Sequence, residues 1–146
     1  MPFNDRELLA RLIKCEAGGE GDTGMQAVAS VVMNRVNDEV GEYGRVGQGS
    51  IRNIIYQLEQ FVCATDVHNG TYNAQNVFNI APEQIHYDIA DWAIAGNRLP
   101  GLGEALWFFN PYSLTCPEYF PSEVGTFVAR IGDHCFYAPT DRYALT

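Results

Sequence analysis

Two features that are common in other classes of protein are missing from this chain of 146 residues. No apolar run approaches the roughly 20 residues that span a membrane as a helix. The first residues, MPFNDRELLARLIK, are charged and amphipathic, which is not typical of a secretory signal. We therefore predict no membrane span. We expect the protein either to stay in the cell that makes it or to leave by a route that needs no signal.

Basic residues are also scarce. Lysine and arginine together number 9 against 18 aspartates and glutamates, which gives a net charge of -9. This charge argues against binding nucleic acid by neutralising phosphates, and against electrostatic capture by an anionic membrane. It favours a neutral or locally cationic substrate, or one that is held by stacking and hydrogen bonds.

Several catalytic and metal-binding motifs are absent as well. The sequence contains no GxSxG, P-loop, dinucleotide-binding, HExxH or EF-hand pattern. Glu16 and Glu20 are two nearby acids, and two carboxylates supply few of the oxygen ligands that a divalent ion needs. We therefore predict no metal site and no cofactor.

The four cysteines, Cys15, Cys63, Cys116 and Cys135, form no CxxC pair, which disfavours a zinc ribbon. Cys15 is interpreted as a small core residue. Cys116 and Cys135 flank a predicted hairpin and are candidates for a disulfide, but the sequence does not choose among the three connectivities. Free thiols are the default expectation for a chain without a signal. A Cys–His nucleophile pair, for example with His134, is an alternative that no local motif supports.

The apolar content of 47% is high enough for one compact domain, 1–146, that buries about two-thirds of its unfolded surface. Helical patterns come first and strand patterns come late, which predicts an α+β fold. Residues 39–50 are interpreted as a glycine-rich loop, and residues 60–79 as a polar loop rich in asparagine. TFVARI and HCFY, on either side of Gly132-Asp133, are typical of a hairpin.

The stretch 8–36, LLARLIKCEAGGEGDTGMQAVASVVMNRV, has the pattern of helix, glycine break and helix. Asn4 is the predicted N-cap of the first helix, in a capping box with Glu7, and Gly18-Gly19 ends this helix through a left-handed backbone. Thr23, in a second capping-box pattern, is the predicted N-cap of the second helix. The buried faces are predicted to be Leu8, Leu9, Leu12 and Ile13 in the first helix, and Met25, Val28, Ala29, Val32 and Val36 in the second.

Two further helices and a strand are predicted downstream. Ser50 is the N-cap of a short helix, and Pro82 suits the first position of another helix, which Gly96 ends. Their core-facing residues are predicted to be Ile51, Ile54, Ile55 and Leu58 in the first, and Ile85, Ile89, Trp92 and Ala93 in the second. ALWFF, residues 105–109, is a strand candidate whose alternating aromatic side chains serve core packing.

Glu16 lies in the last turn of the first predicted helix and extends its apolar face. Burial and the negative end of the helix dipole both disfavour the charged form, so both raise the pKa of this carboxyl. A carboxylic acid with a raised pKa donates a proton near neutral pH, and Glu20 adds like-charge repulsion. The alternative is structural: a glutamate at such a position is more often a surface charge, or salt-bridged to Arg11 or Arg35, than catalytic.

Four blocks of the chain together resemble a known family. LLARLIKCEAGGEGDTGMQAVASVVMNRV, IRNIIYQLEQF, ALWFFNP and CPEYFPSEVGTFVARIGDHCFYAPT are similar to segments of the spore cortex-lytic cell wall hydrolases of the SleB/CwlJ type, in order and over nearly the whole chain. Cys116, the FVAR run and the HCFY ending resemble the short CwlJ-type branch most. The chain departs from the family pattern at Gly18, where a larger residue is frequent, and at Leu58-Glu59, where IYQPxxF is common. The second departure bears on substrate preference near Phe61.

The resemblance implies a lysozyme-like fold related to goose-type lysozyme and lytic transglycosylases. It implies cleavage of the muramic acid–glucosamine glycan of spore cortex during germination, with Glu16 as the catalytic acid and base and Glu20 in support. A lytic transglycosylase needs one carboxylate, whereas a water-using muramidase needs a second, for which Glu20 and Asp66 are candidates.

Substrate-binding or supporting roles are predicted for aromatic, amide and charged side chains, mainly in the stretches 60–79 and 107–120. They are Glu20, Gln26, Phe61, Tyr72, Trp107, Asn110, Tyr112 and His134. Tyr112, Tyr119 and Phe120 lie in a proline-broken loop and are better placed to stack on a ligand than the aromatics of the strand.

The expected partner is peptidoglycan, with a spore-coat protein as a further candidate. The expected location is the boundary between spore coat and cortex, after synthesis in the mother cell. A phage endolysin of the same fold is the alternative. Two other function classes stay open, namely a non-catalytic cortex-binding module and a Cys–His peptidase.

Overall fold

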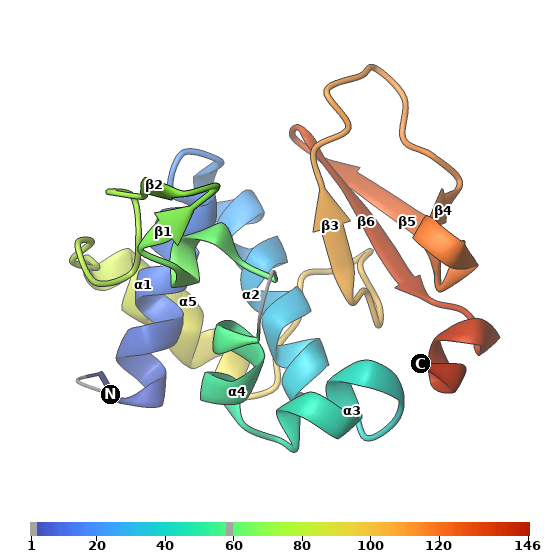
Figure 1. Ribbon diagram of the computed structural model, residues 1–146, viewed down its shortest axis with the longest axis horizontal. Helices are drawn as coiled ribbons and strands as arrows, with labels where there is room; N and C mark the ends of the chain where they lie inside the picture. Colours follow the sequence, from blue (N-terminus) through green and yellow to red (C-terminus); the bar gives the residue numbers. More distant parts are fainter. Residues whose placement is uncertain (1–2, 58–59) are drawn as a thin grey trace.

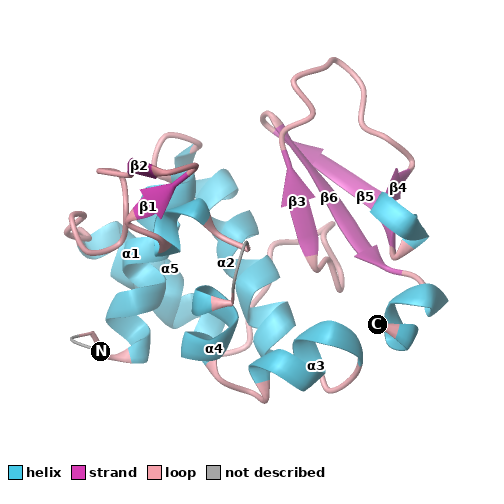
Figure 2. Cartoon of the chain, in the orientation of Figure 1, coloured by secondary structure: helices cyan, strands magenta, loops and turns pink. Residues whose placement is uncertain are grey.

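The computed structural model describes residues 3–57 and 60–146, and it has helices at one side and an antiparallel sheet at the other (Figures 1 and 2). The α-helices are α1 (Asp5–Ala17), α2 (Gly21–Asn37), α3 (Gly41–Gly47), α4 (Ile51–Tyr56) and α5 (Gln84–Ile94). The strands are β1 (Val67–His68), β2 (Thr71–Tyr72), β3 (Trp107–Phe109), β4 (Tyr119–Phe120), β5 (Gly125–Ile131) and β6 (His134–Pro139). Short 3-10 turns are η1 (Val62–Ala64), η2 (Pro121–Glu123) and η3 (Asp141–Leu145). The predicted α+β class is confirmed, and no described helix is both long and apolar enough to cross a membrane.

The first two helices form as predicted, but their junction differs in detail. The Asn4 side chain accepts a hydrogen bond from the Glu7 N–H at 2.8 Å and so caps α1. Gly18 has right-handed backbone angles, and the left-handed glycine is Gly21, with φ 76°. Because Gly21 allows the chain to turn at once, α2 begins there with Glu20 as its N-cap, and the prediction of Thr23 as N-cap is wrong.

Helix α2 is buried on more than the one face that its periodicity predicts. One side packs with α1 and α5 in the main core, where Val28, Ala29 and Val32 are at most 1% exposed. The opposite side forms a second cluster with the sheet and the chain before β3. Its members are Ala27, Val31, Leu102, Ala105 and Phe136. A helix that is apolar nearly all round lies in the interior, and α2 is therefore the central helix that joins the helices to the sheet.

The sheet runs in the order β3-β6-β5-β4 with all neighbours antiparallel. The predicted hairpin is confirmed as β5 and β6, with Ile131 opposite His134 and Gly132 at φ 57° in the turn. Trp107 of β3 is 5% exposed and stacks on Phe120 of β4, with ring centroids 5.2 Å apart. The aromatic strand therefore serves packing, as predicted.

Three local predictions are wrong. Residues 39–50 contain α3 rather than only loop, because Gly41 allows the left-handed turn that precedes it. Pro82 precedes the helix, since α5 begins at Gln84 with Glu83 as its cap. The buried residue near the start of α5 is His86, whose Nδ1 accepts the Glu83 N–H at 2.9 Å. Ile85, predicted to face the core, is 38% exposed.

Of the residues assigned to α4, Leu58 lies outside the described residues, as does Glu59.

The four cysteines form two disulfides, Cys15–Cys63 and Cys116–Cys135, so the default expectation of free thiols is wrong. The first joins α1 to η1, and the second joins the loop after β3 to β6. Since no free thiol remains, a Cys–His nucleophile pair is ruled out for the oxidised protein. The candidate pair Cys116–Cys135 is confirmed. The sequence gave no signal of the Cys15–Cys63 pair, because its partners come from different elements.

The disulfides are expected to stabilise the fold in proportion to the chain they close, 48 residues for Cys15–Cys63 and 19 for Cys116–Cys135. Double alanine substitution should lower the free energy of unfolding by about 4 kcal/mol for the first pair and about 3 kcal/mol for the second. Guanidinium denaturation of both variants and the parent protein measures this. A variant as stable as the parent would show that its disulfide does not restrict the unfolded chain.

Candidate active site

Glu16 occupies the last turn of α1, where its side chain is partly enclosed by the protein and partly open to solvent. Burial removes water from the carboxylate and raises the pKa of Glu16 above its ordinary value. The backbone N–H of Cys63 and the guanidinium of Arg35 act in the opposite sense, because both favour the charged form. The net direction is upward, which suits a group that first donates a proton and then holds a negative charge.

Arg35 supplies the positive charge near Glu16 and is itself 4% exposed. Its Nε donates to the Leu106 carbonyl at 2.7 Å, and its Nη1 donates to Gln60 Oε1 at 3.3 Å. The guanidinium also lies 4.6 Å from the Tyr43 ring centroid and 5.1 Å from that of Phe61, which are favourable cation–π distances. These contacts fix the charge in place.

The structural alternative for Glu16, an ion pair with Arg11 or Arg35, is wrong. Arg11 pairs with Glu7 at 2.8 Å. Within the described part of the chain, neither Glu16 nor Arg35 has an ion-pair partner within 4 Å. Arg35 therefore acts on Glu16 at longer range. It lowers the free-energy cost of ionising the Glu16 carboxyl but forms no ion pair with it.

Glu20 and His134, predicted separately from distant parts of the sequence, face each other across the junction of helices and sheet. His134 Nδ1 lies 3.9 Å from Glu20 Oε1, and the ring of Phe108 packs edge-on against the imidazole at 5.5 Å. Gly132 lies beside them, and a Cβ at this position would come within 2.9 Å of Glu20 Oε2. The contact ties the start of α2 to the β5–β6 turn. Asp66, the other candidate for a second carboxylate, is exposed at the start of the β1–β2 hairpin.

The predicted aromatic contacts divide into buried and exposed groups. Phe61 and Trp107 are 4% and 5% exposed, so neither ring is available to stack on a glycan. Phe61 instead supports Arg35, and Trp107 belongs to the core. Tyr72 and Tyr112 are 63% and 91% exposed, and both remain free to contact a ligand.

Amide side chains hold two of the candidate surfaces in shape. Asn110 Oδ1 accepts the Tyr112 N–H at 2.7 Å, which stabilises the left-handed backbone of Tyr112 at φ 50°. Asn79 donates to the Tyr72 hydroxyl at 2.8 Å. Gln26 lies partly buried on α2, where its carbonyl accepts the Ser30 hydroxyl at 2.8 Å.

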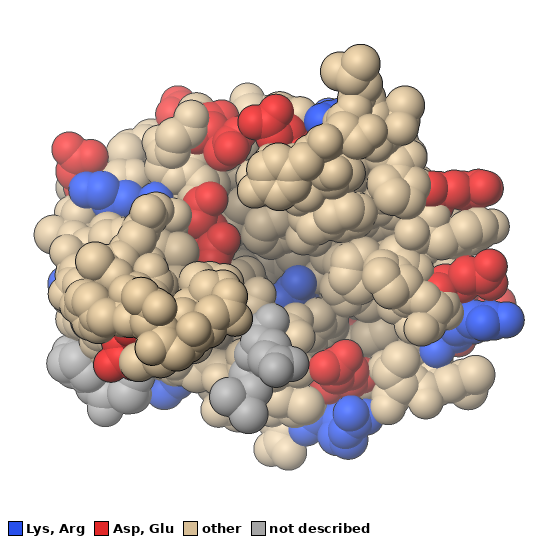
Figure 3. Space-filling model, turned by 45° about the horizontal axis from the view of Figure 1, so that its top comes forward, with Lys and Arg blue, Asp and Glu red and all other residues tan. Residues whose placement is uncertain are grey.

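A hollow separates the helical part from the sheet part, with acidic side chains at its edge and basic atoms in its depth (Figure 3). A different pocket, of about 470 Å³, lies between the end of α2 and η3 and includes Asp38, Leu106 and Tyr143. Neither Glu16 nor Glu20 lines that pocket, so the chemistry of Glu16 has no direct access to it.

Sequence reasoning missed the support of Arg35, namely Tyr43 and Gln60. The Tyr43 hydroxyl donates to Gln60 Oε1 at 2.8 Å, the same oxygen that accepts from Arg35. One signal was present: Arg35 lies three residues past Val32 on the apolar stripe of α2, where an arginine is unusual. Tyr43 and Gln60 carry no comparable signal, because both come from segments without clear periodicity.

Comparison with known proteins adds the family to this geometry. The chain matches the family described as Cell Wall Hydrolase over residues 19–137. This chain belongs to the cell wall hydrolase family. The matched range includes Glu20, Arg35 and His134, and it begins three residues after Glu16.

Known members of the cell wall hydrolase family and related structures agree over most of the chain. The cell wall hydrolase CwlJ of Bacillus subtilis is 35% identical over 136 residues, which are 93% of this chain and 86% of that protein. The spore cortex-lytic enzyme of the same organism is 29% identical over 91% of this chain and 37% of that protein. The catalytic domain of the germination-specific lytic transglycosylase SleB from Bacillus anthracis is 24% identical, with a TM-score of 0.66 over 94% of this chain and 96% of that domain. The structural likeness confirms the predicted fold.

The raised pKa of Glu16 predicts that this residue lowers the free energy of unfolding at pH values where its carboxyl ionises in the unfolded protein. A carboxyl whose pKa is higher in the folded than in the unfolded protein stabilises the fold below the unfolded value, ordinarily about 4.5, and loses this contribution as the pH rises through the folded value. Glu16→Gln should therefore raise the free energy of unfolding at pH 7. At pH 3, where the glutamate is almost entirely protonated in both states and the glutamine is always neutral, the two proteins should be equally stable. Urea denaturation at the two pH values measures the difference, and equal stability at pH 7 would contradict a raised pKa.

Proposed function

We propose that this protein cleaves the glycan strands of spore-cortex peptidoglycan during germination, as a lytic transglycosylase with Glu16 as its single acid and base. The observation that carries the proposal is the environment of Glu16, in which burial raises the pKa while Cys63 N–H and Arg35 support the anion. The family supports peptidoglycan as the substrate. The names of the spore cortex-lytic enzyme and of the germination-specific lytic transglycosylase support cortex and the reaction type.

In the proposed reaction the proton of Glu16 moves to the glycosidic oxygen, and the bond between that oxygen and the muramic anomeric carbon breaks with its electron pair on the leaving sugar. The C6 hydroxyl oxygen of the same muramic residue attacks the anomeric carbon. Its proton passes to the Glu16 carboxylate, which regenerates the acid. The product is a 1,6-anhydro sugar, and neither water nor a cofactor takes part.

Arg35 and the Cys63 N–H contribute at the moment when Glu16 is charged. Both favour the charged carboxylate before the reaction begins, so the site needs little reorganisation as the charge develops. Tyr72 and Tyr112 would offer exposed rings to the sugar faces.

Glu16→Gln tests the proposed role directly. The amide keeps the size of the side chain but carries no transferable acidic proton, so the rate of glycan cleavage should fall by roughly a hundred- to ten-thousand-fold. Release of muropeptides from purified cortex measures the rate, and circular dichroism verifies the fold. A variant with near-parental activity would remove Glu16 from the mechanism.

Product analysis separates the proposed reaction from hydrolysis. Mass spectrometry of the muropeptides should show fragments lighter than hydrolytic ones by one water molecule. Glu20→Gln should leave these products unchanged, because the proposed reaction uses one carboxylate. Ordinary reducing ends that disappear in Glu20→Gln would instead establish a muramidase in which Glu20 activates water. Binding to cortex without any product would identify a non-catalytic module.

The same proposal gives the location as the spore, at the boundary between coat and cortex where the substrate begins. A spore-coat protein remains a candidate partner for holding the enzyme there. Immunogold labelling of dormant spores tests this location, and label confined to the medium of a phage-infected culture would favour the endolysin alternative.

A further inference from the structure

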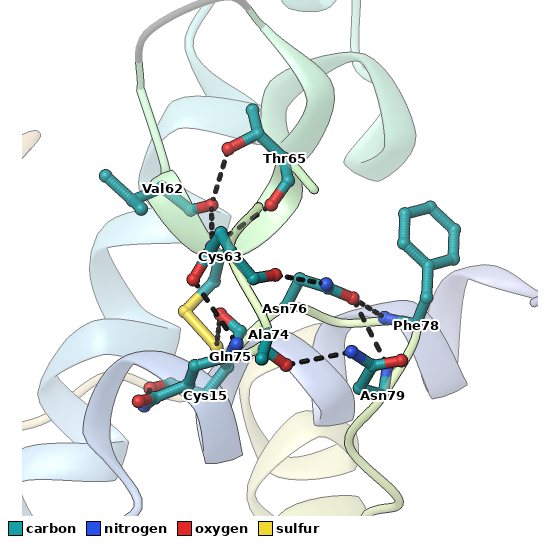
Figure 4. The surroundings of a disulfide bond; sticks show 10 residues. Cys15, Val62, Cys63, Thr65, Ala74, Gln75, Asn76, Phe78 and Asn79 are labelled. Carbon is teal, nitrogen blue, oxygen red and sulfur yellow. Dashed lines mark hydrogen bonds between the residues drawn. A yellow bond between two sulfur atoms is a disulfide. The ribbon is translucent and has the colours of Figure 1, made fainter. Parts of the chain in front are cut away.

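The Cys15–Cys63 disulfide joins the residue that precedes Glu16 in α1 to η1 (Figure 4). Cys15 precedes Glu16 in α1, and Cys63 is the residue whose N–H acts on the Glu16 carboxylate. The disulfide therefore joins the residue that precedes Glu16 to the residue whose N–H favours the charged carboxylate. Such a crosslink limits how far the donor and the carboxyl can separate.

Besides the disulfide, η1 is held mainly through hydrogen bonds of the polar loop that follows it. Within η1 only Cys63 is buried, while Val62 is 48% exposed. Asn73 donates to the carbonyls of Val62 and Thr65, both at 3.1 Å, and these bonds stay within the same loop. The polar loop therefore has its own internal structure, but the disulfide is its covalent link to α1.

Hydrogen bonds around the disulfide extend the link from the catalytic helix into the loop. The Gln75 side chain, which lies beside the disulfide in Figure 4, donates to the Cys15 carbonyl at 3.3 Å. The Val77 N–H donates to the Cys63 carbonyl at 2.9 Å. Arg11 of α1 donates to the Val77 carbonyl at 2.9 Å. These bonds fix the far side of the loop, and none of them uses the Cys63 N–H, which favours the charged form of Glu16.

We propose that Cys15 and Cys63 are positioning residues for Glu16, and that the enzyme reaches full activity only when they are joined as a disulfide. The inference rests on the proposed function of Glu16. Reduction by a dithiol adds two electrons and two protons to the sulfur pair, which becomes two thiols, while the dithiol becomes a cyclic disulfide. The Cys63 N–H is then no longer held near the Glu16 carboxyl by a covalent link to α1. Activity therefore depends on an oxidising environment.

The second disulfide provides a matched control, because Cys116–Cys135 joins the loop after β3 to β6 and includes no residue of α1 or η1. Cys15→Ala/Cys63→Ala should lower kcat on soluble glycan strands by about ten- to a hundredfold, with KM nearly unchanged. Cys116→Ala/Cys135→Ala should keep the parental kcat at a temperature where circular dichroism shows both variants folded. Equal kcat values in the two folded variants, whether high or low, would overturn the proposal.

Redox reversal tests the same point in a protein that contains only the proposed disulfide. Cys116→Ala/Cys135→Ala is unfolded and refolded in dithiothreitol, and alkylation followed by mass measurement verifies complete reduction. The refolded, reduced protein should show the same drop in kcat, and oxidised glutathione should restore it. Full activity in the reduced state would overturn the proposal. If the oxidised parent protein itself releases no cortex fragments, the proposed function fails instead.

A spectroscopic measurement on the parent protein covers the case in which the variants do not fold. Labelling with 15N-cysteine gives four backbone amide signals, one for each cysteine. The Cys63 signal should move with pH as Glu16 titrates, and this movement should be absent in Glu16→Gln. A Cys63 signal that is insensitive to Glu16 would overturn the positioning role independently of any activity.

Discussion

The burial of α2 on nearly all sides is the constraint on which the rest of this structure depends. One side of α2 packs with α1 and α5, and the other meets the sheet through Val31 and Phe136. A side chain on such a helix has little freedom to move, because the interior around it is close-packed. The helix therefore holds Arg35 in the protein interior and Glu20 at the start of α2. It also determines where the helices meet the sheet.

Charge balance around Glu16 follows from this arrangement. A fully buried carboxyl with no support would hold its proton too tightly to act as an acid, whereas an exposed one would lose it near its ordinary pKa. Here burial raises the pKa, while the Cys63 N–H and Arg35 limit the rise. Arg35 provides this support from a position fixed by Gln60, Leu106 and Tyr43, in which it forms no ion pair with a carboxylate of the described residues. The same side chains thus serve both packing and chemistry.

Local patterns predicted most of the secondary structure. Asn4 caps α1, Ser50 caps α4, and Gly132 turns the β5–β6 hairpin, because each of these features depends on a few consecutive residues. Errors occurred where a glycine changed the local path. Gly21 starts α2 before Thr23, and Gly41 allows α3 inside a stretch interpreted as loop. A positive φ at a glycine is permitted by the sequence but is not required by it.

The sequence by itself determined the α+β class, the helix that carries Glu16, the upward direction of its pKa and the resemblance to cell wall hydrolases, since all of these rest on periodicity and short motifs. Only the tertiary structure decided the cysteine pairing, the burial of Phe61 and Trp107, and the approach of His134 to Glu20. These features join residues that are far apart in the chain. Their distances follow from how α2 packs against both α1 and the sheet, and no local pattern in the sequence encodes that packing.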